Sequence, residues 1–366
     1  MELIVRKRLL GSTALLAVAL TAQNAAAAEK INLSLGGYFD AFIVAGSQDE
    51  GAGQSAAGFR GHGIGRESEI FFRGSTTLDN GIKFGVNIQL EGETSADQID
   101  ESYIFAEGGF GRIELGSEDP ATDAMHYGAP NPIGKASINS PDNIHIQTGG
   151  NAAASPATIA NISGDNDKIT YFTPRFGGFQ LGASYTPDAT EEAAGALRAA
   201  NTAGQQSEIV EVAINYEGSF GEVGVNVSGA YAAGDLEVAA AGAQDQEQWA
   251  IGASVTFGGF EVGAAYRQDD LGTTGTNTDR EDIAVGISYG TGPWTIGAQY
   301  AIGEVEAGAA GGKDTSEGLE LGAVYNVGPG IDLTGGVQFW NLDDNLNAAA
   351  NENDATIFII GTNISF

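Results

Sequence analysis

The stretch GIKFGVNIQLE, residues 81–91, alternates between two kinds of side chain at every position. One parity is apolar and comprises Ile82, Phe84, Val86, Ile88 and Leu90. The other parity is small or polar and comprises Lys83, Gly85, Asn87, Gln89 and Glu91. Successive side chains of a β-strand point to opposite faces of its sheet. The stretch therefore predicts a strand with one apolar face and one face that water can wet.

The same period of two recurs along the chain, which indicates an all-β fold. It is clear in FQLGASY (179–185), GEVGVNVSGAY (221–231), WAIGASVTF (249–257), FEVGAAYRQ (260–268), DIAVGISYG (282–290), WTIGAQYAI (294–302), LELGAVYNV (319–327) and IDLTGGVQF (331–339). A soluble sandwich would turn its large apolar side chains inward and its charged ones outward. Here the minor face is Gly, Ser, Asn, Gln and Glu, and the major face is aliphatic with aromatic residues toward the strand ends. This pattern is typical of a transmembrane antiparallel β-barrel with a polar lumen.

Short and long connections alternate between these stretches. Short ones cover 76–81, 107–111, 173–178, 216–221, 257–260, 289–294 and 326–330. Long ones, which are rich in glycine and acidic residues, cover roughly 46–63, 92–98, 118–166, 187–207, 234–247, 269–280, 303–317 and 342–354. Together they predict sixteen strands, with short periplasmic turns and long external loops. The strands at GRESEIFFRGST (65–76) and IDESYIFAE (99–107) alternate less regularly, so their registers are open.

The last stretch, ATIFIIGTNISF (355–366), alternates up to its final residue. In a closed barrel the last strand pairs with the first, here INLSLGGYFDAFIVAG (31–46), and leaves no free edge. The terminal Phe366 resembles the C-terminal signal by which outer-membrane barrels are recognised for assembly. The alternative is an ordinary edge strand that ends in phenylalanine.

The first 28 residues predict export. A basic cluster (Arg6, Lys7 and Arg8) precedes an apolar run from Leu9 to Leu20 and an alanine-rich stretch, as in a cleaved signal peptide. Residues 29–366 then form one domain, and no later apolar run is long enough for a spanning helix. The formal net charge of −32 at pH 7 excludes nucleic acid as a plausible partner, and the absence of cysteine excludes disulfides.

Several stretches in order resemble the general porins of Gram-negative bacteria, of the alphaproteobacterial type. They are RGSTTLDNGIKFGVNIQLEGE (73–93), DESYIFAEGGFGRIELGSEDPATDAM (100–125) and DKITYFTPRFGGFQLGASYTP (167–187). The resemblance spans essentially the whole mature chain. It implies a sixteen-stranded homotrimer in the outer membrane, in contact with its lipid, that lets small hydrophilic solutes and ions diffuse passively.

The third long connection, residues 118–166, is by far the longest and is called loop 3 here. In similar porins this loop folds into the barrel and narrows it. Basic residues gather on the strands near its two ends: Arg66, Arg73, Lys83, Arg112 and Lys168. The loop offers the acidic residues Glu118, Asp119, Asp123, Asp142, Asp165 and Asp167. A cationic wall facing an anionic loop would set ion selectivity, and we expect a weak preference for cations. The alternative is a set of solvated surface ion pairs.

Other candidate sites are weak. His62, His126 and His145 lack the spacing of a metal site or of a hydrolase. Catalysis and cofactors are not expected. Acidic stretches such as SEDPATD (117–123) and DNLNAAANEND (344–354) could bind Ca²⁺, although neither has the spacing of a defined calcium loop. The rival functions are a substrate-specific channel for a sugar or phosphate, a non-conducting structural or adhesive barrel, and a barrel enzyme.

Overall fold

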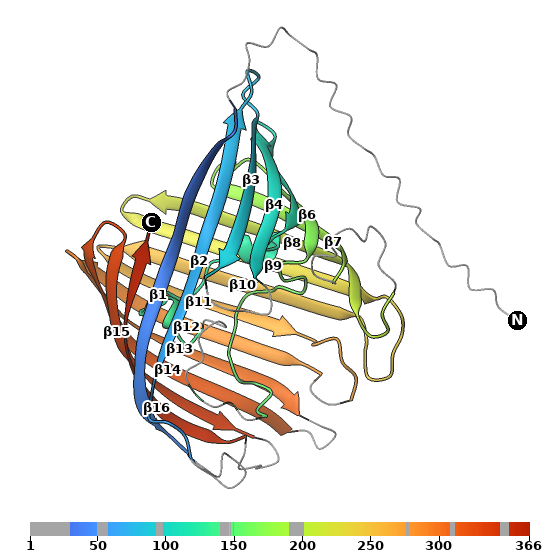
Figure 1. The fold of residues 1–366 in the computed structure, drawn as a ribbon. Coiled ribbons are helices and arrows are strands. Elements are labelled where there is room, and N and C mark those ends of the chain that lie inside the picture. Colours follow the sequence, from blue (N-terminus) through green and yellow to red (C-terminus); the bar gives the residue numbers. More distant parts are fainter. Residues whose placement is uncertain are drawn as a thin grey trace, which may run out of the picture.

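The computed structural model describes residues 30–49, 58–92, 98–139, 146, 148, 150–189, 201–275, 278–307, 312–344 and 351–366. They form a closed barrel of sixteen antiparallel strands, each paired with its neighbours in sequence, with β16 beside β1 (Figure 1). The predicted barrel and its strand number are confirmed. The predicted signal peptide, residues 1–28, lies outside the described residues and stays a prediction.

The strands are β1 (Asn32–Gln48), β2 (His62–Thr77), β3 (Lys83–Glu91), β4 (Ile99–Gly108), β5 (Gly111–Ser117), β6 (Asp167–Phe172), β7 (Phe179–Asp188), β8 (Gln206–Phe220), β9 (Val223–Leu236), β10 (Gln246–Phe257), β11 (Phe260–Asp269), β12 (Arg280–Thr291), β13 (Trp294–Ala307), β14 (Gly312–Gly328), β15 (Ile331–Asp343) and β16 (Asn353–Ser365). The helix α1 (Ala121–Ala124) and the 3-10 helix η1 (Gly134–Ala136) both lie in loop 3. Within the described ranges, no helix is long and apolar enough to cross a membrane.

The strands pair in registers that keep apolar residues opposite apolar ones and polar residues opposite polar ones around the barrel. Phe72 pairs with Ile88 on the outer face, and Arg73 pairs with Asn87 on the inner face. Partners directly across two strands share a face of the sheet. The outer face is therefore an almost continuous band of exposed aliphatic side chains, and the inner face is polar or small. A sheet that is apolar outside and polar inside suits a lipid exterior and an aqueous lumen.

The barrel closes between β1 and β16 over eleven residue pairs, from Tyr38–Ser365 to Gln48–Ala355. The last residue continues the ladder, because the backbone N–H of Phe366 donates to the carbonyl of Gly37 at 3.0 Å and the reciprocal bond has the same length. The predicted pairing of the terminal strand is confirmed. The role of Phe366 in assembly stays a prediction.

Two details differ from the sequence pattern. The long connection expected over 303–317 is mostly strand, since β13 and β14 pair as far as Ala307–Gly312. Strands can pair through their backbones without alternating apolar residues. Strand ends that extend beyond the lipid band and are polar are therefore not predicted from the alternation of apolar residues. The second detail is a register shift between Ile88 and Leu90 where β3 pairs with β4, which accounts for the irregular alternation of the fourth strand.

Candidate pore constriction

The inner wall of β2 carries an exposed arginine. Arg73 faces inward beside Asn87, and two contacts fix the position of its side chain. Its Nε donates to Asn87 Oδ1 at 3.2 Å, and its guanidinium carbon lies 4.3 Å from the centre of the Phe71 ring. A cation over a ring face is attracted by the ring quadrupole. The arginine head is therefore held against the wall while still reaching water.

A second cationic group surrounds Phe105 on β4. Lys83 Nζ lies 5.5 Å and the Arg112 guanidinium carbon 3.8 Å from the centre of that ring. Arg112 also forms ion pairs with Glu107, at 3.3 Å, and with Glu114. All five residues lie on the inner face, close to the short turns. Arg112 is thus largely neutralised by glutamates, whereas no described residue forms an ion pair with Lys83.

Arg66 and Lys168 do not line the open lumen. Arg66 pairs with Ala41 and shares the outer face with Ile64 and Ile70. Lys168 faces inward, but it is only 2% exposed. Its Nζ donates to the carbonyl of Gly164 at 2.7 Å and to that of Glu118. Lys168 therefore joins the two ends of loop 3, and this role cannot be read from strand parity.

The acidic residues of loop 3 gather at the other end of the wall. Oxygens of Asp119, Asp165 and Glu101 (on β4) lie within 4.8 Å of one another. Asp123 accepts a hydrogen bond from Asn161 Nδ2 at 3.1 Å. Carboxylate oxygens are ligands that Ca²⁺ prefers, so Ca²⁺ binding at this acidic stretch remains a prediction. Glu118 is buried, Asp167 is the first residue of β6, and Asp142 lies outside the described residues.

The acidic and basic groups are therefore separated along the strands rather than placed across the lumen from each other. The acidic group lies where β4, β5 and β6 meet loop 3, and Arg112 lies at the short-turn end of β5, five residues before Ser117, which ends the strand beside loop 3. Five residues of strand span about 17 Å. A permeating ion would meet the acidic group and the basic group in succession along one wall.

Enclosure in the barrel perturbs the loop side chains. Burial raises the pKa of Glu118, and neighbouring Glu114 raises it further. Loss of bulk water inside the barrel, followed by the charge of Asp123, raises the pKa of Asp119 to about 7. Burial lowers the pKa of His126 to about 4, so this imidazole is neutral at pH 7. His126 thus acts as a neutral packing residue of the loop.

The outgoing half of loop 3 runs along the inner wall from β7 to β15. Three of its backbone N–H groups donate to inward side chains: Ala121 N to Ser184 Oγ at 2.8 Å, Tyr127 N to Ser228 Oγ at 2.9 Å and Ile138 N to Glu320 Oε2 at 3.2 Å. Side chains of the wall also donate to the loop, as Gln338 Nε2 does to the carbonyl of Ala136 at 2.6 Å. Each bond fixes the loop to a different strand.

The returning half is held by two arginines that the sequence analysis missed. Arg280 donates to the carbonyl of Ser155 at 2.6 Å, and Arg267 donates to that of Ile159 at 3.3 Å. Both arginines form ion pairs with Asp282, which has no exposed side-chain surface. Further along, Glu211 accepts from Ile162 N at 3.0 Å. These contacts could have been predicted from the many charged residues at inward positions of β8, β11 and β12.

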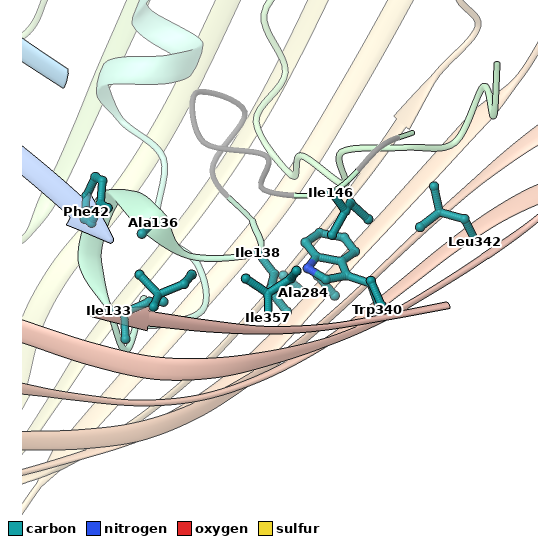
Figure 2. Packing of buried hydrophobic residues seen from close by; sticks show 12 residues of the cluster. Phe42, Ile133, Ala136, Ile138, Ile146, Ala284, Trp340, Leu342 and Ile357 are labelled. Atoms are coloured by element: carbon teal, nitrogen blue, oxygen red, sulfur yellow. The ribbon is translucent and has the colours of Figure 1, made fainter. Parts of the chain in front are cut away.

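The middle of loop 3 packs into an apolar cluster on the inner wall (Figure 2). Ile133 and Ile138 of the loop lie among side chains from β1, β15 and β16, including Phe42, Trp340 and Ile357 (Figure 2). These wall residues have the inward parity and are at most 5% exposed. Apolar residues on a lumen face are explained by this contact, because burying them against the loop removes them from water.

Inward glycines let the loop approach the wall. A Cβ on Gly252 would collide with the carbonyl of Tyr127, and one on Gly263 would collide with that of Gly128. The loop therefore covers one side of the lumen closely. On that side the inward residues Glu211 and Glu320 are fully buried, whereas Arg73 on the opposite side is exposed.

Comparison with known proteins agrees with this architecture. A model of the Gram-negative porin family matches residues 12–345. A porin of Rhodobacter capsulatus is 22% identical over 239 residues, which cover 65% of this chain and 61% of that relative.

Solved structures share the fold at low identity. An anion-selective porin from Comamonas acidovorans superposes with a TM-score of 0.64 at 20% identity, covering 92% of this chain and all of the other. The outer membrane protein OmpT of Vibrio cholerae, in a trimer form, gives 0.61 at 14% identity with the same coverage. A mutant of Rh. blastica porin gives 0.59 at 19%, again with that coverage. The chain therefore belongs to the Gram-negative porin family, which is non-enzymatic.

Proposed function

We propose that this chain forms a water-filled channel in the outer membrane for the passive diffusion of small hydrophilic solutes and ions. One observation carries the proposal: loop 3 covers the inner wall from β7 through β16 to Phe42 of β1, and Arg73 and Lys83 on β2 and β3 stay exposed. Arg73 and Lys83 face inward and yet are exposed, which requires accessible space beside them. A plugged, purely structural barrel would bury them.

We further propose a weak preference for cations. Inward glutamates outnumber the inward cations Arg73, Lys83 and Arg112 on the wall of β2–β5: Glu67, Glu69, Glu91, Glu107 and Glu114. Asp119 and Asp165 add to this negative charge at the loop end, and Arg112 is paired with two of the glutamates. Rings of carboxylates attract cations into a pore. Arg73 and Lys83 act against this preference, so it is expected to be modest.

Outward aromatic residues support placement in a membrane. Near the short turns, Phe179 contacts Tyr216 and Phe260 contacts Tyr289, with ring centres 4.9 and 4.4 Å apart. Near the long loops, Trp249 lies 5.0 Å from Tyr266. Tyr and Trp favour the two membrane interfaces, where one end of the ring is apolar and the other is wet.

The same residues suggest which arc of the barrel meets other subunits. Outward Tyr and Trp occur on strands from β6 to β14, as at Tyr171 and Tyr325. On the arc from β15 through β1 to β5, the described outward residues include neither; this arc combines exposed apolar residues such as Ile43 and Ile360 with small or polar ones, among them Ala41, Ser68 and Thr356. Small residues allow close packing between proteins in a membrane. We propose a homotrimer that associates through this arc.

Planar-bilayer conductance of the refolded mature protein under a KCl gradient tests the function. We expect steps in groups of three and a reversal potential of cationic sign. The variant Arg73→Gln should increase the cation preference, and Arg66→Gln, on the outer face, is the matched control. Folded protein without conductance would refute the channel, and an anionic sign would refute the assigned selectivity while leaving the pore.

A further inference from the structure

We propose that the short-turn end of the lumen holds a subsite for a small zwitterion, namely an α-amino acid with an apolar side chain. This inference rests on the proposed channel function, because it concerns a solute inside the channel. A cavity of about 410 Å³ lies there between the β4–β5 turn, the β6–β7 turn and the end of α1. Small-molecule sites have volumes of roughly 300–1,000 Å³.

Two oriented guanidinium groups line this cavity. Arg175 donates to the carbonyl of Gly178 at 2.7 Å and to Gln180 Oε1 at 3.1 Å. These bonds use two of its five N–H groups and hold its plane in place, and Glu217 Oε2 lies 3.7 Å from its Nη2. Arg112 is held in turn by its ion pair with Glu114 and by the Phe105 ring, 3.8 Å away. A guanidinium whose orientation is already fixed binds a carboxylate in bidentate fashion at low entropic cost.

An acidic side chain lies beside them. Glu107 lines the same cavity, has 48% of its side chain exposed and lies 3.3 Å from Arg112 Nη1. A simple anion would have to compete with Glu107 for this arginine. A simple cation drawn to Glu107 would meet Arg112 and Arg175. A zwitterion can offer its carboxylate to Arg175, whose carboxylate partner Glu217 is more distant at 3.7 Å, and its ammonium to the exposed Glu107, so one solute meets both signs.

The remaining lining is apolar. Met125, which is 3% exposed, and Phe172 contribute to the cavity from loop 3 and from β6. Methionine is unbranched and adapts to the shape of an apolar neighbour. An aliphatic side chain such as that of leucine can contact these two residues while its charged groups reach Arg175 and Glu107.

Three probes test the subsite in planar bilayers, each added to either side in turn: L-leucine, 4-methylpentanoate, which lacks the ammonium, and 3-methylbutylamine, which lacks the carboxylate. We expect L-leucine to reduce the current in a saturable way, from one side preferentially, at concentrations about tenfold lower than either analogue requires. Equal block by all three, or stronger block by an analogue, would overturn the proposal.

Two variants locate the effect. Arg175→Gln and Glu107→Gln should each raise the concentration of leucine that gives half-maximal block about tenfold, as expected from loss of a charge-assisted contact. Lys313→Gln, which removes a cation at the outer end of β14, is the control and should leave the block unchanged. Unchanged block in both lumen variants would overturn the site. A channel that conducts but does not respond to leucine refutes the subsite alone, whereas absence of conductance refutes the proposed function.

Discussion

Replacing Glu320 by alanine should release the middle of loop 3 from the wall. This carboxyl group on β14 is fully buried and accepts three hydrogen bonds. The donors are Ser137 Oγ at 2.8 Å, Ile138 N at 3.2 Å and Gln338 Nε2 at 2.9 Å. The first two come from the loop and the third from β15. Glu320 is therefore a direct link between loop and barrel.

The magnitude follows from the two bonds that break when this part of the loop lifts. A hydrogen bond to a charged or buried acceptor contributes about 1–2 kcal/mol net, so Glu320→Ala should lower the local opening free energy by about 3 kcal/mol. A change of about 1.4 kcal/mol is tenfold in an equilibrium constant, which makes the expected effect roughly a hundredfold. The apolar contacts of Ile133 and Ile138 are retained, so the loop remains docked most of the time.

Amide hydrogen exchange measures this opening directly, because the Ile138 amide is itself one of the donors. Its exchange should accelerate about a hundredfold in Glu320→Ala, following the same free-energy estimate. The control is Glu304→Ala, which removes a partner of Lys313 on the outer side of β13, 2.6 Å away. Exchange at Ile138 within about threefold of the wild type would refute the assignment of Glu320 as an anchor.

Three other outcomes are expected. The raised pKa of Asp119, about 7, means that cation preference in reversal-potential measurements should increase from pH 6 to pH 8, and Asp119→Asn should flatten this change even though Asp123 remains. The pKa of His126 is lowered to about 4, so its contribution to stability is present above pH 6.5 and is lost as the pH falls toward 4. Between pH 7.5 and pH 4.5, the free energy of unfolding measured in urea should therefore fall by roughly 2 kcal/mol more for the wild type than for His126→Gln. In the assembled protein, Ala41→Cys should be shielded from a lipid-soluble thiol reagent and Ala264→Cys should be accessible, and equal labelling would contradict the proposed subunit arc.

The barrel could be predicted from the sequence because strand parity is a local property. The inward placement of Lys83 and Arg112 follows from the same alternation, since both stand among small or polar neighbours on their own parity, and Arg73 shares its parity with Glu69 and Ser75 as well as Phe71. Arg66 shows the limit. We expected Arg66 on the pore wall because it is basic. It has the same parity as Ile64 and Ile70, however, and this parity places it on the outer face. Whether an inward side chain is buried was harder to predict than the face on which it lies, because burial depends on the loop that covers the strand.

The path of loop 3 along the wall does not follow from strand parity. The residues of the wall indicate this path better than the sequence of the loop does. Glycine recurs at inward positions of β7, β10, β11 and β14, in FQLGASY, WAIGASV, FEVGAAY and LELGAVY. An aqueous lumen alone does not require glycine, since serine or asparagine would be wetted as well. A Cβ at Gly182, Gly252, Gly263 or Gly322 would instead meet loop 3 within van der Waals distance. A row of glycines on one side of a barrel therefore marks where a segment of backbone lies against it. The inward positions of β2 and β3 that carry Arg73 and Lys83 lie outside this row, and the lumen stays accessible there.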